Sequence, residues 1–307
     1  MGYESQYIWI NGKLVENEKA TVHFLSATLH YGTGAFEGIR CYATPKGPAV
    51  FRLREHIRRL VDSAHIMGFR ELPYSIDELM DAVKLTVRSN GFRECYIRPL
   101  VYVGTANPTL NTDNGTVDIG IAVWEWNSYL GEEALENGIR ANISSFTRHH
   151  INVMMTKAKI TGNYANSTLA KTESVRLGFD EAIMLDTQGY VSECTGENLF
   201  IVRGGKIYTP PTAAILEGIT RDAALTLARD EGIEVIEQPV SRDQLYIADE
   251  VFVSGTAAEL VAVREIDFRT IGAGKMGPVT RRMQKVFHAA IHGEHPRSAE
   301  WLDCVNP

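Results

Sequence analysis

The sequence has few cysteines and no long apolar run. Its four cysteines form no CxxC pair, which argues against a zinc site and predicts free thiols in a reducing cytoplasm; they are Cys41, Cys95, Cys194 and Cys304. No uninterrupted run approaches the roughly 20 apolar residues that span a bilayer, so we expect no membrane partner. The first residues, MGYESQ, have neither the basic start nor the apolar core of a signal peptide.

Positive charge is not in excess either. Lys and Arg total 31 against 38 Asp and Glu, which gives a net charge of -7 over 307 residues. A nucleic-acid-binding protein normally carries a basic face, so we predict no nucleic-acid partner. The acidic balance favours solubility and is compatible with an anionic ligand in a local basic pocket. The length allows one large domain or two moderate ones.

Hydrophobic periodicity changes repeatedly between the strand and helix patterns, which predicts a mixed α/β (α+β) fold. Ser75-Ile-Asp-Glu78 is a capping box that opens one of these helices. We expect strands at 7–10, 49–53, 96–103, 117–126, 181–186, 198–203, 206–208 and 251–253. We expect helices at 54–67, 75–89, 164–177 and 221–230, and a final helix from residue 278.

Two segments lack such periodicity. Residues 104–115 are rich in Asn, Pro, Thr and Gly and are predicted to form a loop. Residues 127–138 are polar and flanked by glycine, and we interpret them as a linker. The sequence thus predicts a smaller N-terminal domain over residues 1–126 and a larger domain over residues 139–307.

Several familiar motifs are incomplete. Gly272-Ala-Gly-Lys275 resembles part of a phosphate-binding P-loop, but Arg269 and Met276 occupy positions that need other residues. His288, His292 and His295 have a metal-like spacing on the predicted last helix, but Ala289 stands where a zinc protease needs Glu. We therefore predict no metal site. The sequence contains neither the Gly-x-Ser-x-Gly elbow of hydrolases nor a strand-linked dinucleotide motif.

The segment Tyr190–Phe200 carries two carboxylates, Glu193 and Glu197, among small residues between two predicted strands. A buried carboxylate needs a cation or hydrogen-bond donors, because stripping its water is costly. The pattern therefore indicates a positively charged partner, and the sequence does not identify it.

Two further segments are typical of anion sites. Leu216-Glu-Gly218-Ile219-Thr220 leads into a predicted helix, with Thr220 as a suitable N-cap, and helix N-termini bind phosphate. Residues 254–258 follow a strand and consist of small residues whose amides can form an anion-binding nest. A simply capped helix and a tight turn are the alternative interpretations.

Spacing along the sequence does not show which of two lysines is functional. Lys157 and Lys159 lie two positions apart, and on a strand both would share one face. Either could serve chemistry, and both could be solvated.

Taken in order, these segments resemble the fold-type IV pyridoxal-phosphate enzymes. The matching segments are Lys159 with Gly162-Asn163-Tyr164, residues 192–200, Gly218 to Arg221, and Gly255 to Glu259. The front half is similar to the bacterial branched-chain amino acid aminotransferases, through His30-Tyr31-Gly32, Phe36-Glu37-Gly38-Ile39-Arg40 and Tyr96-Ile97-Arg98-Pro99. The resemblance runs from about Tyr7 to Asn306 and implies a two-domain fold, with pyridoxal 5'-phosphate between the domains and bound mainly by residues 139–307.

The resemblance also implies a role for each matching residue. Lys159 would bind the cofactor covalently and carry the catalysis. Glu193 would face the pyridine nitrogen with Glu197 behind it, Tyr164 would bind the ring hydroxyl oxygen, and Leu216 would pack on the ring. The phosphate would be bound at the helix start that Gly218 opens, by Arg59, Ile219, Thr220 and Thr256.

Substrate residues follow in the same way. Tyr96 and the amides of Thr256 and Ala257 would take the substrate carboxylate. The side-chain pocket would be lined by Phe36, Tyr164, Trp126, Tyr129 and the partner subunit's Tyr31, which requires a homodimer or a higher homo-oligomer. Arg98 would pair with the second carboxylate of glutamate, a structural ion pair being its alternative role.

The implied reaction moves the amino group of leucine, isoleucine or valine to 2-oxoglutarate. Thr161 stands where the family commonly has glycine, and Cys194 and Thr195 replace smaller residues, which leaves the breadth of substrates open. Alternative functions are a D-amino acid or (R)-amine aminotransferase, an aminodeoxychorismate lyase of the same fold, and a non-catalytic binder of phosphate-bearing ligands.

Overall fold

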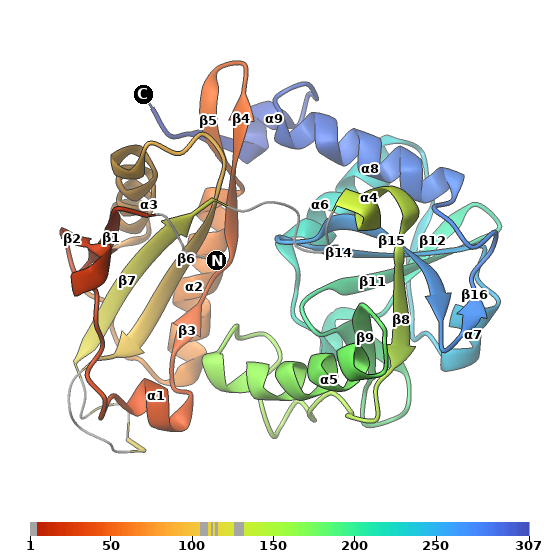
Figure 1. The fold of residues 1–307 in the computed structure, drawn as a ribbon, viewed down its shortest axis with the longest axis horizontal. Helices are drawn as coiled ribbons and strands as arrows, with labels where there is room; N and C mark the ends of the chain where they lie inside the picture. The colour runs from red at the N-terminus through yellow and green to blue at the C-terminus, as the bar shows by residue number, and fades with distance from the viewer. Residues whose placement is uncertain (1–4, 105–109, 112, 114–115, 126–131, 307) are drawn as a thin grey trace. The chain divides into compact units, whose positions relative to one another are not determined.

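The computed structural model describes residues 5–104, 110–111, 113, 116–125 and 132–306 (Figure 1). Contacts divide the chain into two compact units. Unit 1 comprises Met1–Trp126, Ala158–Asn163 and Ala290–Pro307, and unit 2 comprises Asn127–Lys157 and Tyr164–Ala289. No helix in the described part of the chain is long and apolar enough to cross a membrane.

Unit 1 contains, among its described residues, an eight-stranded sheet in the order β17-β5-β4-β6-β7-β1-β2, with β3 paired to β6. Its strands are β1 (Tyr7–Ile10), β2 (Lys13–Glu16), β3 (Ala35–Phe36), β4 (Ile39–Thr44), β5 (Gly47–Phe51), β6 (Cys95–Val103), β7 (Val117–Trp124) and β17 (Leu302–Cys304). Its helices are α1 (Ala27–Tyr31), α2 (Leu53–Met67), α3 (Ile76–Asn90) and α9 (Ser298–Trp301).

The two long helices of unit 1 form because each has one apolar face to bury. Ile57 and Leu60 of α2 and Leu79 and Val83 of α3 are fully buried in one core with the strands of the sheet. The predicted capping box of α3 is present: the Ser75 hydroxyl accepts from the Glu78 N–H and the Glu78 carboxylate accepts from the Ser75 N–H.

Unit 2 contains a nine-stranded sheet within the described residues, in the order β10-β9-β8-β15-β14-β11-β12-β13, with β16 paired to β15. Its strands are β8 (Ile139–Ile143), β9 (Glu181–Leu185), β10 (Val191–Cys194), β11 (Asn198–Arg203), β12 (Lys206–Thr209), β13 (Val235–Glu237), β14 (Glu250–Gly255), β15 (Glu259–Ile266) and β16 (Arg269–Thr270). Its helices are α4 (Glu132–Asn137), α5 (Tyr164–Arg176), α6 (Ile219–Asp230), α7 (Arg242–Tyr246) and α8 (Pro278–Ile291), the last of which ends in unit 1.

Most expected elements are confirmed to within a few residues, including the start of α8 at Pro278. The expectation that α8 is the last helix is wrong, because α9 and β17 follow it. His292 and His295 therefore lie beyond α8, whereas His288 is on it. The described residues hold no group of three or more His, Cys, Asp or Glu side chains that could bind a metal ion.

Candidate active site

Lys159 lies in the short segment that the chain contributes to unit 1 between two stretches of unit 2. Its backbone N–H donates to the Ser63 hydroxyl at 2.9 Å, and its carbonyl accepts from the Phe36 N–H at 3.0 Å. Its Nζ lies 5.1 Å from the centre of the Phe36 ring. Helix α2 and strand β3 thus fix the backbone of Lys159 through two hydrogen bonds.

Lys157 has different surroundings. Its Nζ pairs with Glu217 at 2.7 Å and donates to the Thr212 carbonyl, and both charged side chains are about half exposed. Residues 151–158 contain turns and bends, so the two lysines do not lie on a strand. The turns direct Lys157 to unit 2 and Lys159 to unit 1, a separation that spacing along a strand does not predict.

A fully buried carboxylate, Glu37, joins Arg59 and His56 of α2. Arg59 donates from Nε to Oε1 at 2.6 Å and from Nη2 to Oε2 at 2.9 Å, and the Nδ1 of His56 lies 2.7 Å from Oε2. Burial by itself would raise the pKa of Glu37, but the charge of Arg59 and the hydrogen bonds from His56 and Arg59 together hold that pKa far below its usual range. Arg59, for which the resemblance implies a phosphate contact, thus pairs with an anion to which the sequence analysis assigned no role.

Arg98 is surrounded by aromatic rings. Its guanidinium carbon lies 4.9 Å from the centre of the Phe36 ring, 5.3 Å from that of Tyr96 and 5.8 Å from that of Trp124. It also donates from Nη2 to the Tyr96 hydroxyl at 3.3 Å. Among the described residues Arg98 forms no ion pair, so cation–π contacts hold it in place. This arrangement leaves its charge available to an anionic ligand.

The ring of Trp124 is a neighbour of Arg98 that the sequence analysis missed. Trp124 on β7 is the register partner of Tyr96 on β6, and their ring centres are 5.0 Å apart. The period-2 alternation of β7 is the signal that points to it, because partners across two strands share a face. Trp126 and Tyr129, the aromatic residues that were named, lie outside the described residues.

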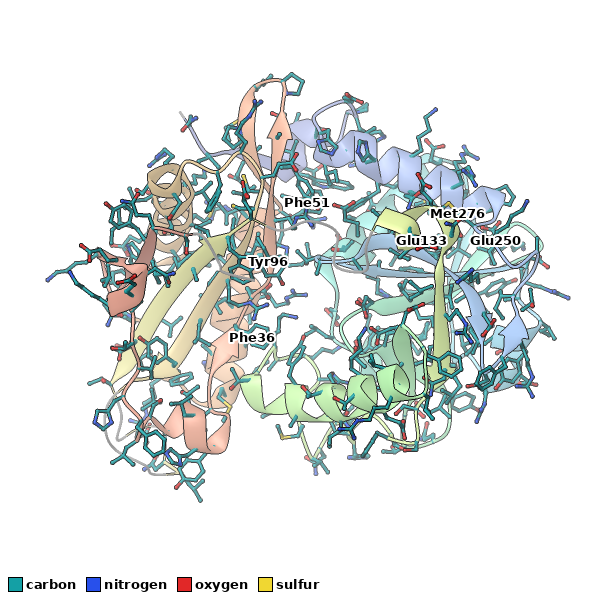
Figure 2. The ribbon with its side chains drawn as sticks, viewed as in Figure 1. Phe36, Phe51, Tyr96, Glu133, Glu250 and Met276 are labelled. Atoms are coloured by element: carbon teal, nitrogen blue, oxygen red, sulfur yellow. The ribbon has the colours of Figure 1, made fainter. Side chains whose placement is uncertain are left out.

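Close packing around Tyr96 explains the glycine at position 38. A Cβ atom on Gly38 would lie 1.9 Å from the Tyr96 hydroxyl oxygen, so this position requires glycine. Figure 2 labels Phe36 and Tyr96, whose rings contact Arg98. Tyr31, the proposed partner-subunit contact, ends α1 and is 45% exposed.

The carboxylate of Glu193 has three partners in unit 2. Arg148 pairs with its Oε1 at 2.8 Å, and Oε2 accepts from the Asn198 side chain at 3.2 Å and from the Leu216 N–H at 3.1 Å. Glu193 lies on β10, within a strand rather than between strands as the sequence suggested. It is only 5% exposed. Arg148 is one cation that Glu193 meets, and no sequence motif around Arg148 predicts this contact.

Glu197 lies in the bend between β10 and β11, where it forms hydrogen bonds with residues close to it in the sequence. It is buried, its carbonyl accepts from the Cys194 N–H at 2.8 Å, and its carboxylate accepts from the Gly196 N–H at 3.2 Å. A Cβ atom on Gly255 would lie 3.1 Å from its Cγ. Glu197 is thus packed against the end of β14.

The N-terminus of α6 is built around a glycine. The helix begins at Ile219 with Gly218 as its N-cap and no side-chain cap, so the expectation that Thr220 caps a helix from Arg221 is wrong. A Cβ atom on Gly218 would lie 2.0 Å from Oδ1 of Asn198. The same Asn198 binds Glu193, so one amide joins the carboxylate to the helix start.

Residues 256–258 form the turn between β14 and β15, where Gly255 pairs with Glu259. The neighbouring Ser254 pairs in register with Asn198, which brings this turn to the same end of the sheet as Glu193. Thr256 and Ala257 lie within the turn. Tyr164 is the first residue of α5 and is partly buried.

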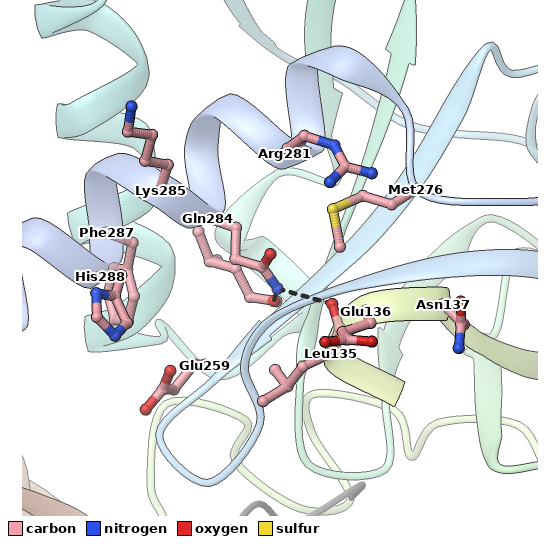
Figure 3. A pocket seen from close by; sticks show the side chains of 11 residues that line it. Leu135, Glu136, Asn137, Glu259, Met276, Arg281, Gln284, Lys285, Phe287 and His288 are labelled. Carbon is pink, nitrogen blue, oxygen red and sulfur yellow. Dashed lines mark hydrogen bonds between the residues drawn. The ribbon is translucent and has the colours of Figure 1, made fainter. Parts of the chain in front are cut away.

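A separate hollow of about 650 Å³ lies in unit 2 (Figure 3). It is formed by α4, β15 and α8, and Gln284 bridges its floor by donating to the carbonyls of Leu135 and Leu260 at 3.1 Å each. Figure 3 shows Arg281 and Lys285 on α8. None of the predicted site residues lines this hollow.

The sequence pattern of one protein family, described as Amino-transferase class IV, matches residues 34–266. The chain belongs to the class IV amino-transferases. The resemblance stated from sequence motifs is therefore confirmed.

Individual proteins are similar to this chain over nearly their whole length. A branched-chain-amino-acid aminotransferase of Pseudomonas aeruginosa is 50% identical over 298 residues, which is 97% of each chain. The Escherichia coli branched-chain amino acid aminotransferase structure matches with a TM-score of 0.96 and 50% identity, over 99% of this chain and 100% of that one.

A second solved structure that is similar to this chain is a PLP-form. The branched-chain amino acid aminotransferase from Thermobaculum terrenum, in its PLP-form (holo-form), matches with a TM-score of 0.92 and 35% identity, over 100% of both chains. These likenesses confirm the predicted mixed α/β, fold-type IV architecture.

Proposed function

We propose that this protein is a branched-chain L-amino acid aminotransferase that uses pyridoxal 5'-phosphate. It moves the amino group of leucine, isoleucine or valine to 2-oxoglutarate and releases the branched 2-oxo acid and L-glutamate. The observation that carries the proposal is the combination of a buried, ion-paired Glu193 and a backbone-fixed Lys159, in a chain about half identical to relatives with that name.

The chain's own residues fit this cofactor. A pyridine nitrogen needs an anion, and the buried carboxylate of Glu193 fits this need, because it pairs with Arg148 and accepts hydrogen bonds from Asn198 and Leu216. A phosphate needs N–H donors, and α6 begins without a side-chain cap, so its first amides can serve. We propose that Gly218, Ile219, Thr220 and Thr256 bind the phosphate with Arg59, that Leu216 packs on the ring, and that Tyr164 binds the ring hydroxyl oxygen.

Catalysis requires a group that accepts an electron pair and residues that control the protons. When bound, the protonated pyridine ring takes up the charge that develops at the substrate Cα. Glu193 would keep the ring nitrogen protonated, and Glu197 would support it from behind. Nζ of Lys159 would take the proton from the substrate Cα as a general base. Its backbone, held by Ser63 and Phe36, limits how far that amine can move.

The active site must accept substrates with apolar side chains and substrates with acidic side chains. An apolar wall alone excludes the second carboxylate of glutamate, because burying an unpaired charge is costly. Arg98 among aromatic rings satisfies both needs: the rings of Phe36 and Tyr96 contact a branched side chain, and the guanidinium pairs with a carboxylate. Tyr96, Thr256 and Ala257 would bind the α-carboxylate, with Trp126 and Tyr129 as further pocket residues.

We further propose that the enzyme works as a homodimer or a higher homo-oligomer, with the partner subunit's Tyr31 at the pocket. The segment around α1 exposes a group of large apolar side chains, which supports this proposal because exposed apolar patches favour association; these are Val22, Phe24, Leu25 and Leu29, exposed by 42%, 78%, 40% and 63%. A Leu29→Asp variant should sediment as a smaller species than the parent protein.

Two finer assignments belong to the same proposal. We propose that residues 127–138 link a domain of residues 1–126 to one of residues 139–307. We also propose a cytoplasmic location, which the free thiols support because cysteines in oxidising compartments are usually bridged.

The function is tested by incubating the protein, loaded with pyridoxal 5'-phosphate, with L-leucine and 2-oxoglutarate and measuring L-glutamate. Formation of glutamate at ordinary enzyme rates is expected. No glutamate from leucine, isoleucine or valine, together with turnover of D-alanine, an (R)-amine or aminodeoxychorismate, would show that the activity is that of another member of the fold.

A further inference from the structure

The carboxylate of Glu37 accepts several hydrogen bonds. Besides the two bonds from Arg59 and the one from His56, its Oε2 accepts from the Gly38 N–H at 3.2 Å. The side chain is fully buried, whereas that of Arg59 is 14% exposed. The carboxylate is therefore the fully buried member of the pair, and the Arg59 side chain retains some exposure.

The backbone of Glu37 is fixed as well. Its N–H donates to the Pro99 carbonyl at 3.0 Å, and the preceding residue, Phe36, donates to the carbonyl of Lys159 at 3.0 Å. The position of the carboxylate is thus determined by the same run of hydrogen bonds that fixes the backbone of Lys159. A rigid anchor of this kind can position a partner to within a fraction of an ångström.

His56 supports the anchor as a neutral donor. Burial lowers the pKa of His56 below its usual value, and the positive charges of Arg59 and Lys159 add to this, while Glu37 opposes it. A neutral imidazole 2.7 Å from the carboxylate donates from Nδ1, so its proton is on that nitrogen. The ion pair is therefore between Glu37 and Arg59, and His56 completes the shell of the carboxylate.

We propose that Glu37 is a positioning residue that holds the Arg59 guanidinium in the orientation in which it binds the cofactor phosphate. Arg59 uses its Nε and Nη2 to meet the two oxygens of Glu37, so the fork is fixed in its plane and rotation about its axis is prevented. The phosphate then meets an arginine whose rotamer is already set, which reduces the ordering cost of binding. This inference rests on the proposed role of Arg59.

The experiment compares two ligands that differ only in the phosphate, pyridoxal 5'-phosphate and pyridoxal. Equilibrium fluorescence titration gives the Kd of each for the apoprotein, and the ratio of the two Kd values is the phosphate preference. It is measured for the wild type, Glu37→Gln, Arg59→Gln and the double variant. We expect Glu37→Gln to lower the preference at least tenfold and the double variant to equal Arg59→Gln, since Glu37 acts through Arg59.

Glu250→Gln is the matched control, because Glu250 is also a buried carboxylate but caps α8 through the N–H groups of Val279 and Thr280. Its phosphate preference should equal that of the wild type. Glu37→Asp, which keeps the charge, should recover part of the preference. The proposal is overturned if Glu37→Gln weakens the binding of both ligands equally or leaves the phosphate preference unchanged. It is also overturned if the losses of preference are additive in the double variant.

If Glu37→Gln does not fold, Arg59→Lys supplies the test from the other partner. Lysine keeps the charge but cannot bind the two oxygens of Glu37 in one plane, so the phosphate preference should fall tenfold or more. A preference equal to that of the wild type would then reject the positioning role. No step in these titrations depends on transamination, so a failure of the proposed activity is detected separately in the leucine assay.

Discussion

Arg148 pairs with Glu193, its Nη2 lying 2.8 Å from Oε1 in a site where both side chains are more than nine-tenths buried. A neighbouring guanidinium favours the charged form of a carboxylate, whereas burial alone favours its neutral form. A charged Glu193 is the form that can hold a proton on a pyridine nitrogen. Arg148 is thus the cation that meets Glu193 within unit 2 and favours the charged form that the proposed role of Glu193 needs.

Substitution of Glu193 should separate catalysis from binding. Glu193→Gln removes the charge with little change in shape, so we expect kcat to fall at least about 100-fold, equivalent to about 2.7 kcal/mol or two pKa units of tuning at the ring nitrogen. The cofactor should remain bound, since its phosphate contacts are unchanged. Steady-state rates and the visible absorption of the bound cofactor measure the two effects.

Glu197→Gln is the comparison for that experiment. Its carboxylate accepts from the adjacent Gly196 N–H, whereas Arg148 pairs with Glu193. We expect a decrease in kcat of less than about tenfold, or about 1.4 kcal/mol. A larger effect for Glu197→Gln than for Glu193→Gln would reverse the assignment of the two carboxylates.

The two lysines should differ completely in reactivity. Reduction of the holoenzyme with borohydride followed by peptide mapping should place the cofactor on Lys159. Lys157→Ala should retain the label and most of the activity, because its half-exposed pair with Glu217 contributes at most about 1 kcal/mol. Lys159→Ala should lose both. Label on Lys157 would contradict the site described above.

Arg98 should distinguish acidic from branched substrates. Arg98→Met keeps apolar bulk among the three rings and removes the charge, so the KM for 2-oxoglutarate should rise about 10- to 100-fold, matching about 1.5–3 kcal/mol for a hydrogen bond to a charged group. The single-turnover rate with leucine should change much less. Parallel losses for both substrates would indicate that Arg98 is structural.

His149 should make the stability depend on pH. Burial and the neighbouring Arg148 lower the pKa of His149 from 6.5 to about 4. The unfolded chain therefore takes up a proton between pH 6.5 and about 4 that the folded protein does not, so stability is full above pH 6.5 and decreases as the pH falls toward 4. In calorimetric scans, the Tm of His149→Gln should decrease less between pH 7 and pH 5 than the Tm of the wild type. An equal loss would show that His149 does not titrate in this window.

Local patterns predicted most of the secondary structure, because periodicity and caps act within a few residues. The apolar face of α2, the capping box at Ser75 and Pro278 at the start of α8 illustrate this. The failures occurred where distant chain segments override local signals. Thr220 is a good N-cap residue, yet the N-cap of α6 is Gly218, which fits closely against Asn198 of β11.

The candidate site shows the same division. The ordered motifs identified the family and named Lys159, Glu193 and Arg98, because those residue types are required by the chemistry. Arg148, Trp124 and Glu37 received no role, since their importance comes from which residue they contact. Arg148 is 45 positions from Glu193 along the chain, and only the sheet of unit 2 and the turns beside it bring them together.

The sequence by itself determined the family of this chain, two carboxylates in need of a positively charged partner, and two candidate lysines. The tertiary structure decided which cation one of these carboxylates meets and which of the two lysines has its backbone fixed. Both choices depend on burial and on hydrogen bonds between residues far apart in the chain. Such contacts exist only after the strands have paired, so spacing along the sequence cannot express them.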